Sequence, residues 1–242
     1  MTPTTPATTG PAPACPCVPE IPDNVAALIV DFDGTLADTT DSHEQALREA
    51  LQPYGIDLDH HWYRDHVGLS INELLTELPG AALLPHEQII HRSRTRLLAT
   101  VDTITPIACV VSLLHAARGA GLPCAVASGA SRILVDPGIE TLGLAGEFAA
   151  VVTREDVLHA KPAPDLFAEA ARRLGVAPRA CLAVDDARDG LASARAAGMQ
   201  VITVYDGHLS SLDDSTTRAA ISRCPDRSTA HIGGPAPSDE GA

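Results

Sequence analysis

A short apolar run that ends in two carboxylates restricts the fold of this chain more than any other feature. Residues 26–30 are all apolar, and Asp31, Phe32, Asp33 and Gly34 follow directly. A short apolar run with β-branched residues is typical of a buried strand in a parallel sheet. Ligands of open parallel sheets gather beyond the carboxyl ends of the strands, so we expect both aspartates there, on one side of the strand. Taken alone, the pattern also fits a strand followed by an ordinary Asp-Gly turn.

Strand-like and helix-like patterns alternate along the rest of the chain. Apolar runs typical of strands lie at residues 26–30, 123–127, 149–153, 181–184 and 201–204. Helical patterns lie between the later runs, at residues 107–120, 133–142, 165–174 and 190–197. This alternation predicts an α/β fold, in which a Rossmann-like parallel sheet carries helices on both faces.

The first strand is separated from the second by an unusually long segment with helical patterns only. These patterns lie at residues 42–51, 60–66, 71–78 and 86–101. A compact domain seldom contains so long an excursion unless the excursion is a module of its own. We therefore predict a small α-helical cap over residues 38–105, inserted after the first strand of a core formed by residues 25–37 and 106–208.

Composition predicts loose ends and excludes several classes of partner. Residues 1–24 are rich in Pro, Thr and Ala, and residues 209–242 in Ser, Asp, Gly and Pro, so both are predicted to be disordered. The formal net charge of −14 argues against nucleic acids and anionic membranes as partners. No apolar run approaches the length of a membrane span, and no signal segment opens the chain. A cytoplasmic protein, monomeric or homodimeric, is expected.

The six cysteines predict neither a disulfide framework nor a zinc site. Cys15 and Cys17 form a Cys-Pro-Cys sequence, with no second Cys or His pair at zinc-site spacing. Cys109, Cys124 and Cys181 lie in apolar patterns, where cysteine is typically a small buried hydrophobic residue.

Polar residues follow each of the later strands. Ser128 and Gly129 open a turn before a helix, where a hydroxyl and outward N–H groups suit a phosphate oxygen, although such a serine is usually an ordinary N-cap. Lys161 precedes Pro162, which restricts the backbone, so the ammonium could bind phosphate or simply lie on the surface. Asp185 and Asp186 form a second carboxylate pair at a strand end.

This second pair is difficult to explain by structure alone. Burying Asp185 and Asp186 without a cation would raise their pKa values and cost stability. Together with Asp31 and the backbone carbonyl of Asp33, they would form an oxygen-only site of the kind that suits Mg²⁺. Each motif alone has a structural explanation, but their combination at successive strand ends indicates a catalytic site.

The chain resembles the haloacid dehalogenase superfamily over residues 25–206. It is most similar to the branch with an α-helical cap after the first strand, which contains β-phosphoglucomutase-like proteins and phosphoglycolate-type phosphatases. Further matches are His43 and Gly68 in the cap. Four loop motifs carry the resemblance in type and order: Asp31-Phe32-Asp33-Gly34-Thr35, Ser128, Lys161-Pro162 and Asp185-Asp186.

The resemblance implies phosphoryl transfer to a carboxylate. Asp31 would attack the phosphoryl group and form an aspartyl-phosphate. Asp33 would protonate the leaving oxygen and then deprotonate the attacking water. Mg²⁺ would be bound by Asp31, the Asp33 backbone carbonyl and Asp186, with Asp185 in support.

The resemblance also implies which residues bind the phosphate. Ser128, Gly129 and Lys161 would hold the phosphate oxygens. Thr35 is assigned to the same group and is expected to orient Asp33. His43 is expected to contact either the substrate or Asp33.

One departure from the family pattern favours hydrolysis. The mutases of this branch place an arginine shortly after the cap glycine to bind a second phosphate, whereas this chain has Ile71 there. We therefore predict a Mg²⁺-dependent phosphatase of a small phosphate ester, such as a sugar phosphate or a phosphoglycolate-like compound. The alternatives are a hexose-phosphate mutase and, in another class, a catalytically weak binding or regulatory protein with this fold.

Overall fold

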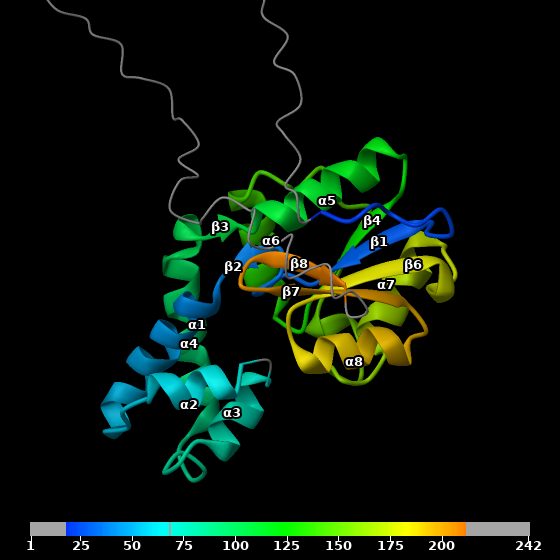
Figure 1. Cartoon of the computed structure of the whole chain (residues 1–242). Helices are drawn as coiled ribbons and strands as arrows, with labels where there is room; N and C mark the ends of the chain where they lie inside the picture. The colour runs from blue at the N-terminus through cyan, green and yellow to red at the C-terminus, as the bar shows by residue number, and fades with distance from the viewer. Residues whose placement is uncertain (1–17, 68, 212–242) are drawn as a thin grey trace, which may run out of the picture.

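The computed structural model describes residues 18–67 and 69–211 (Figure 1). Its main sheet has six strands in the order β5-β4-β1-β6-β7-β8, all parallel except β8. The predicted fold class is confirmed. The strands are β1 (Ala27–Val30), β4 (Cys124–Ala127), β5 (Ala150–Val152), β6 (Cys181–Asp185), β7 (Gln200–Tyr205) and β8 (His208–Ser211).

Helices cover both faces of this sheet because alternate residues of the buried strands point to opposite sides. Leu28 and Val30 of β1 pack with α5 (Ala108–Gly119) and α6 (Arg132–Thr141). Ala27 and Ile29 pack on the other face, with α7 (Asp165–Leu174) and α8 (Arg188–Ala196). Apolar burial on both faces explains why the strand sequences are continuous apolar runs.

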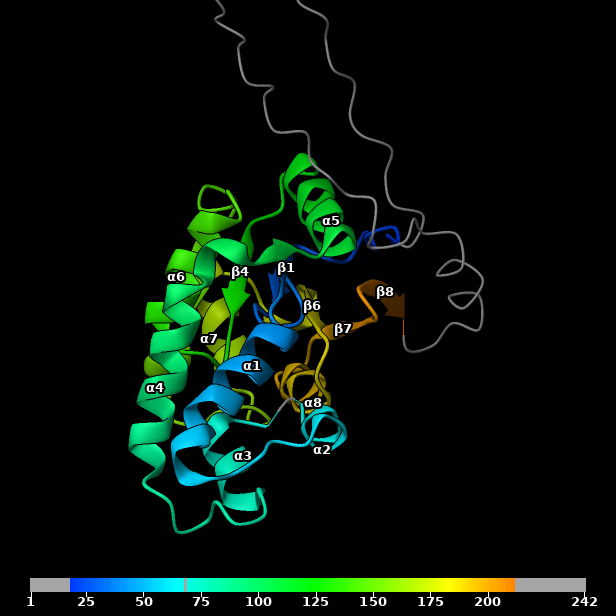
Figure 2. The same ribbon diagram turned by 90° about the vertical axis from the view of Figure 1, so that its left-hand side faces the viewer.

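A separate group of helices lies beside the carboxyl end of β1 (Figures 1 and 2). Its members are α1 (Thr40–Leu51), α2 (His60–Asp65), α3 (Ile71–Glu77) and α4 (His86–Ala99). They enclose a hydrophobic cluster of their own, which includes Leu51, Leu75 and Ile89. These four helices are called the cap from here on, and the predicted domain boundaries remain predictions.

Short elements join these parts. The chain leaves and re-enters the core through an antiparallel pair, β2 (Ala37–Asp38) and β3 (Thr105–Pro106). Four 3₁₀ turns complete the described structure: η1 (Gln52–Tyr54), η2 (Val101–Thr103), η3 (Arg154–Asp156) and η4 (Pro178–Ala180). Among the described residues, no helix is long and apolar enough to cross a membrane.

The structure differs from the prediction at both ends of the core. Strand β8 was not predicted, although Asp206 and Gly207 both have positive φ and form the Asp-Gly turn typical of a two-residue hairpin. Residues 209–211, which were assigned to the tail, therefore belong to the sheet. Val18 and Ile21, which were assigned to the disordered arm, pack against the core.

Residues 1–17 of the predicted arm and 212–242 of the predicted tail lie outside the described residues, and with them Cys15, Cys17 and Cys224. The other three cysteines, Cys109, Cys124 and Cys181, are buried as predicted.

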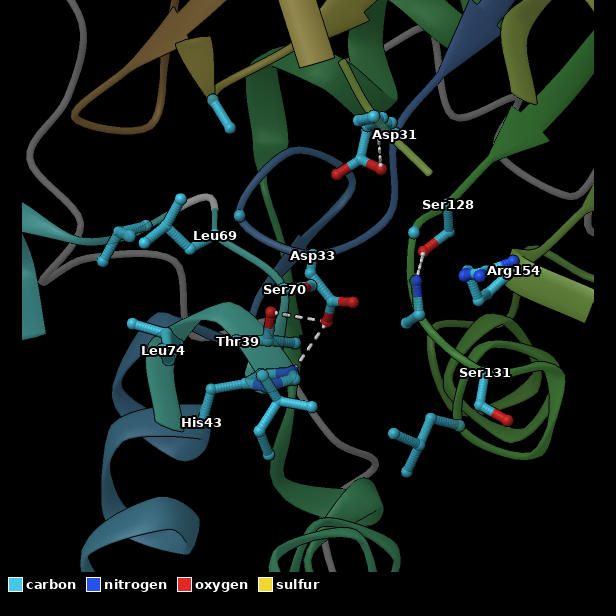
Figure 3. Close-up of a pocket in the computed structure, with 18 of the residues that line it drawn as sticks. Asp31, Asp33, Thr39, His43, Leu69, Ser70, Leu74, Ser128, Ser131 and Arg154 are labelled. Carbon is cyan, nitrogen blue, oxygen red and sulfur yellow. Dashed lines mark hydrogen bonds and ion pairs between the residues drawn. The ribbon is translucent and has the colours of Figure 1, made fainter. Parts of the chain in front are cut away.

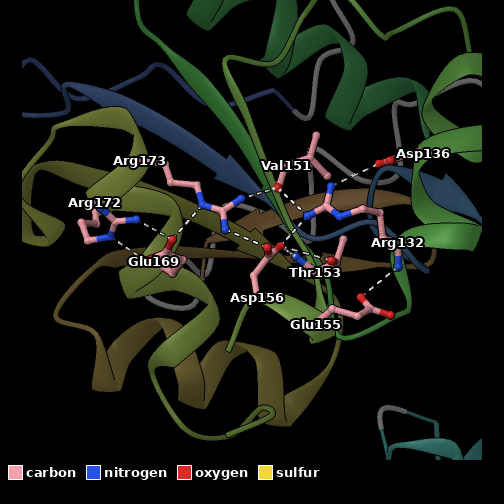
Figure 4. Close-up of polar contacts among 9 residues, drawn as sticks. All are labelled: Arg132, Asp136, Val151, Thr153, Glu155, Asp156, Glu169, Arg172 and Arg173. Carbon is pink, nitrogen blue, oxygen red and sulfur yellow. Dashed lines mark hydrogen bonds and ion pairs between the residues drawn. The ribbon is translucent and has the colours of Figure 1, made fainter. Parts of the chain in front are cut away.

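A polar network secures the edge strand β5 (Figure 4). Asp156 accepts a hydrogen bond from the backbone N–H of Thr153 at 2.8 Å, and its carboxylate pairs with the guanidinium groups of Arg132 and Arg173. Both arginines also donate to the carbonyl of Val151, at 3.2 and 3.0 Å. Asp156 thus ties η3 to α6 and α7.

Replacing Asp156 is expected to destabilise the fold in a pH-dependent way. Burial alone would raise the pKa of Asp156. Hydrogen bonds from Arg173 and Thr153 and the charge of Arg132 outweigh this effect and lower the pKa to about 2. Asp156→Ala should reduce the free energy of unfolding by about 2 kcal/mol at pH 7. Because the folded pKa lies below the unfolded value of about 3.9, this contribution is present above about pH 4 and is lost as the pH falls towards 2.

Urea unfolding of wild type and Asp156→Ala at pH 7 and pH 3 measures the difference between their free energies of unfolding. Asp136→Ala is the control, because it removes only a half-exposed pair with Arg132 at 3.6 Å and should cost less than about 0.5 kcal/mol. An equal effect of Asp156→Ala at both pH values would refute the assigned ion pairs.

Candidate active site

The end of β1 places the first carboxylate pair at the carboxyl edge of the sheet. The Asp31 N–H donates to the carbonyl of Val184 in β6 at 2.9 Å, and Asp31 is only 6% exposed. The chain then turns at Gly34, whose φ of +74° favours glycine. A Cβ atom at this position would lie 2.4 Å from Oδ2 of Asp186. Gly34 therefore permits both the turn and the close approach of the second carboxylate pair.

Lys161 joins the two strand ends. Its ammonium donates to Asp31 Oδ1 at 2.6 Å and to Asp185 Oδ2 at 2.7 Å. All three side chains are almost fully buried. The sequence also singles out Lys161, because it is the only lysine among the 17 lysine and arginine residues of the chain.

Asp31, Asp185 and Asp186 form a cluster suited to a cation. One carboxylate oxygen of each lies within 4.8 Å of the others. Burial raises the pKa of Asp31, as do the charges of Asp185 and Asp186, against the opposing effect of Lys161. Burial and Asp185 raise the pKa of Asp186 to about 6.

The donor set of this cluster fits Mg²⁺. Three carboxylates face one ammonium, which leaves two negative charges in a buried site. A divalent cation would balance them, and a set of hard oxygen donors is what Mg²⁺ prefers. The fit of the residues therefore agrees with the metal that the resemblance implies.

Asp33 is bound by two residues of the cap side (Figure 3). Its Oδ1 accepts a hydrogen bond from Oγ1 of Thr39 at 2.9 Å and lies 3.0 Å from Nε2 of His43. Burial alone would raise the pKa of Asp33, but the charge and hydrogen bond of His43 and the hydrogen bond of Thr39 lower it. Burial would lower the pKa of His43, but Asp33 raises it. His43 thus contacts the expected catalytic acid, one of its two expected partners.

Ser128 follows β4 and is not the N-cap of the next helix. Helix α6 begins at Arg132 after its N-cap Ser131. The Ser128 hydroxyl accepts a hydrogen bond from the N–H of Ala130 at 3.0 Å, and Ser128 and Gly129 both line the cavity beside Asp31. The ordinary N-cap interpretation of Ser128 is therefore wrong.

The structure corrects the expected role of Thr35. Thr35 is fully buried and donates to Oδ1 of Asp186 at 2.7 Å. The side-chain hydrogen bonds to Asp33 found among the described residues come from Thr39 and His43, and none comes from Thr35. Because the chain reverses at Gly34, Thr35 lies against the metal-site carboxylates and not against the substrate cavity.

Thr35→Val is expected to weaken Mg²⁺ binding by about 10-fold, because hydrogen bonds that orient a ligating carboxylate typically contribute this much. Calorimetric titration of the metal-free protein with Mg²⁺ measures the change without relying on activity. Thr39→Val is the matched control: it should lower kcat through Asp33 and leave Mg²⁺ affinity unchanged. Equal Mg²⁺ affinity of Thr35→Val and wild type would contradict the assigned role.

A cavity of about 440 Å³ connects these residues to the cap. Ile71, at the position where the mutases of the branch have an arginine, lines this cavity. Gly68 lies outside the described residues. Several other lining residues could not be identified from the sequence, because it does not reveal which helix faces turn inwards. These are Thr39, Tyr63, Asn72, Arg94 and Arg154.

The chain is similar to known proteins over most of its length. The family model "Haloacid dehalogenase-like hydrolase" matches residues 28–204. Fructose-1-phosphate phosphatase YqaB of Escherichia coli (strain K12) is 36% identical over 191 residues, which cover 75% of this chain and 97% of that protein. Protein CbbY of Rhodobacter capsulatus is 33% identical over 222 residues, covering 84% of this chain and 94% of the relative.

A solved structure is similar as well. The crystal structure of CbbY from Rhodobacter sphaeroides in complex with phosphate superposes with a TM-score of 0.66 at 27% sequence identity. The match covers 74% of this chain and 85% of that one.

Proposed function

The chain belongs to the haloacid dehalogenase-like hydrolase family, and on this basis we propose that it is a Mg²⁺-dependent phosphatase of a small phosphorylated metabolite. One observation carries the proposal: two aspartates at the cavity have different partners. Lys161 bridges Asp31 and Asp185, whereas Asp33 is paired with His43. Two carboxylates in such different environments are suited to two different roles.

Asp31 acts as the nucleophile in this proposal. Its carboxylate attacks the phosphorus in line with the leaving oxygen, so that the new O–P bond forms as the ester O–P bond breaks. Lys161 fixes the orientation of Asp31 and, with the Ser128 and Gly129 turn, stabilises charge on the phosphoryl oxygens. Asp31, Asp185, Asp186 and the Asp33 carbonyl would hold Mg²⁺, which when bound supplies charge stabilisation to the phosphoryl group.

Asp33 moves the protons. It passes a proton from His43 to the leaving oxygen, and then accepts one from the water that hydrolyses the aspartyl-phosphate. His43 Nε2 lies 3.0 Å from Asp33 Oδ1, so the pair can share a proton during both steps. Thr39 keeps Asp33 in position.

The cavity suits a small substrate. Its volume of about 440 Å³ is of the size that holds one metabolite, and residues of both the cap and the core line it. The named activity of YqaB towards fructose 1-phosphate supports a sugar phosphate as the substrate class. Ile71 in the cavity wall favours hydrolysis over the mutase alternative, and the intact carboxylate and lysine set argues against a binding protein without activity.

A phosphate-release screen tests this proposal. Wild type with Mg²⁺ is incubated with sugar phosphates, phosphoglycolate and aryl phosphates, and inorganic phosphate is measured. We expect release from at least one metabolite, abolished by chelation of Mg²⁺. Isomer interconversion without net phosphate release would indicate the mutase, and no reaction with any ester would indicate the binding protein.

A further inference from the structure

Two arginines line the cavity, one from the cap and one from the core. Arg94 extends from α4 of the cap, and Arg154 from η3 of the core. Within residues 18–67 and 69–211, neither forms an ion pair with a carboxylate. Many other arginines do, on both the cap and the core: Arg48, Arg64, Arg96, Arg118, Arg132, Arg172 and Arg173.

Arg94 lies on the face of α4 that is turned to the cavity. Ile90, Ser93 and Leu97 line the same cavity, and their spacing of i−4, i−1 and i+3 from Arg94 places them on one side of the helix. Arg94 is half-buried there. A guanidinium on an otherwise largely apolar face loses hydration when a substrate fills the cavity, which is unfavourable unless an anion accompanies it.

Arg154 retains most of its hydrogen-bonding capacity. Arg154 is exposed, and among the described residues its guanidinium, which has five N–H donors, bonds only to the carbonyl of Val157, from Nη1 at 3.1 Å. The neighbouring Glu155 also lines the cavity but forms no ion pair with Arg154 in the described part of the chain; its carboxylate accepts hydrogen bonds from the Ser131 hydroxyl and the Arg132 N–H. The backbone N–H of Arg154 donates to the carbonyl of Ala130 at 3.1 Å, which places Arg154 next to the turn that begins at Ser128 (Figure 3).

We propose that Arg94 and Arg154 form a second anion subsite that binds a carboxylate or a second phosphate on the leaving group of the substrate. This inference rests on the proposed phosphatase activity. The transferred phosphoryl group is already provided for by Ser128 and Lys161, so the two arginines are available for another anion. Guanidinium groups bind carboxylates and phosphates through paired hydrogen bonds, which makes them specific for such groups.

Matched pairs of esters test the subsite. Fructose 1-phosphate is compared with fructose 1,6-bisphosphate, and phenyl phosphate with 4-carboxyphenyl phosphate, so that the two pairs separate phosphate from carboxylate recognition. We expect wild type to prefer the member with the second anion in at least one pair. Arg94→Gln and Arg154→Gln should each lower kcat/KM for that ester about 10- to 100-fold, mainly through KM, because a charged hydrogen bond is lost.

The same variants should change kcat/KM for the matched ester without the second anion by less than about 3-fold, since that ester has no group for the subsite to bind. Arg94→Lys should restore part of the loss. The control is Arg92→Gln, on the same helix, whose guanidinium lies 5.8 Å from the centre of the Tyr54 ring; it should behave as wild type with every ester.

Two results would overturn the subsite: no preference of wild type in either pair, or equal losses by the variants with both members of a pair. If wild type hydrolyses no ester, the proposed function itself fails. Binding of fructose 1,6-bisphosphate, measured by calorimetry in wild type and Arg94→Gln, then decides the subsite separately, and equal affinities would refute it.

Discussion

Asp31→Asn should abolish phosphate release, with kcat lowered by about 10⁴-fold or more, as is typical when a catalytic nucleophile is removed. Asparagine has nearly the same shape as aspartate but cannot form the aspartyl-phosphate. Its side-chain oxygen can still accept the hydrogen bond from Lys161 that Asp31 accepts at 2.6 Å. The loss is therefore expected to be chemical and not structural. Steady-state assays with the best substrate of the screen measure it.

The stability of the same variant provides an independent check. Asp31 is one of three clustered carboxylates, and burial and its two acidic neighbours raise its pKa. Removing its charge should leave the free energy of unfolding without Mg²⁺ unchanged or higher. Asp41→Asn, at a cap position whose side chain is 86% exposed, is the control and should retain full activity. Asp31→Asn with more than about 1% of wild-type activity would exclude Asp31 as the nucleophile.

Lys161→Met should have the largest effect on stability. Lys161 is the cation that bridges Asp31 and Asp185, and its side chain is 12% exposed. Removing one partner of a buried ion pair leaves uncompensated charge and typically costs about 3–5 kcal/mol. Methionine preserves most of the aliphatic length, so the loss reports the charge more than the volume. Activity should also fall by at least about 100-fold, because charge stabilisation at the phosphoryl group is lost.

Urea unfolding of wild type and Lys161→Met with and without Mg²⁺ separates the stabilisation by the Lys161 ammonium from the stabilisation by the metal. Bound Mg²⁺ would supply part of the missing positive charge, so the destabilisation should be smaller with the metal than without it. In the metal-free protein, adding Asp185→Asn to Lys161→Met should recover part of the stability. A cost of less than about 1 kcal/mol in the metal-free protein would show that the ammonium does not compensate the carboxylates.

The sequence predicted most elements of this fold because they follow periodic apolar patterns. Strands and helices of the core lie within a few residues of their expected positions. The residues at successive strand ends could be predicted to meet because parallel strands share one carboxyl edge. Strand β8 was missed because its four residues, His208–Ser211, carry little apolar pattern, and only the Asp-Gly turn before it indicated a hairpin.

Side-chain directions could not be predicted from spacing in the same way. Thr35 and Thr39 both follow Asp33 closely, and the left-handed turn at Gly34 decides which of them contacts it. Arg94 was missed for a similar reason, because only tertiary packing defines the face of α4 that lines the cavity.

Capture of the covalent intermediate tests the central claim most directly. Asp33→Asn should slow the hydrolysis of the aspartyl-phosphate, because Asp33 is the proposed base for the attacking water. Acid quenching of this variant during turnover, followed by mass spectrometry of its peptides, locates any phosphoryl group. We expect one phosphoryl group on Asp31, removable by hydroxylamine and absent without Mg²⁺. A phosphoryl group on another residue, or wild-type phosphate release with none on Asp31 in either protein, would contradict the proposed mechanism.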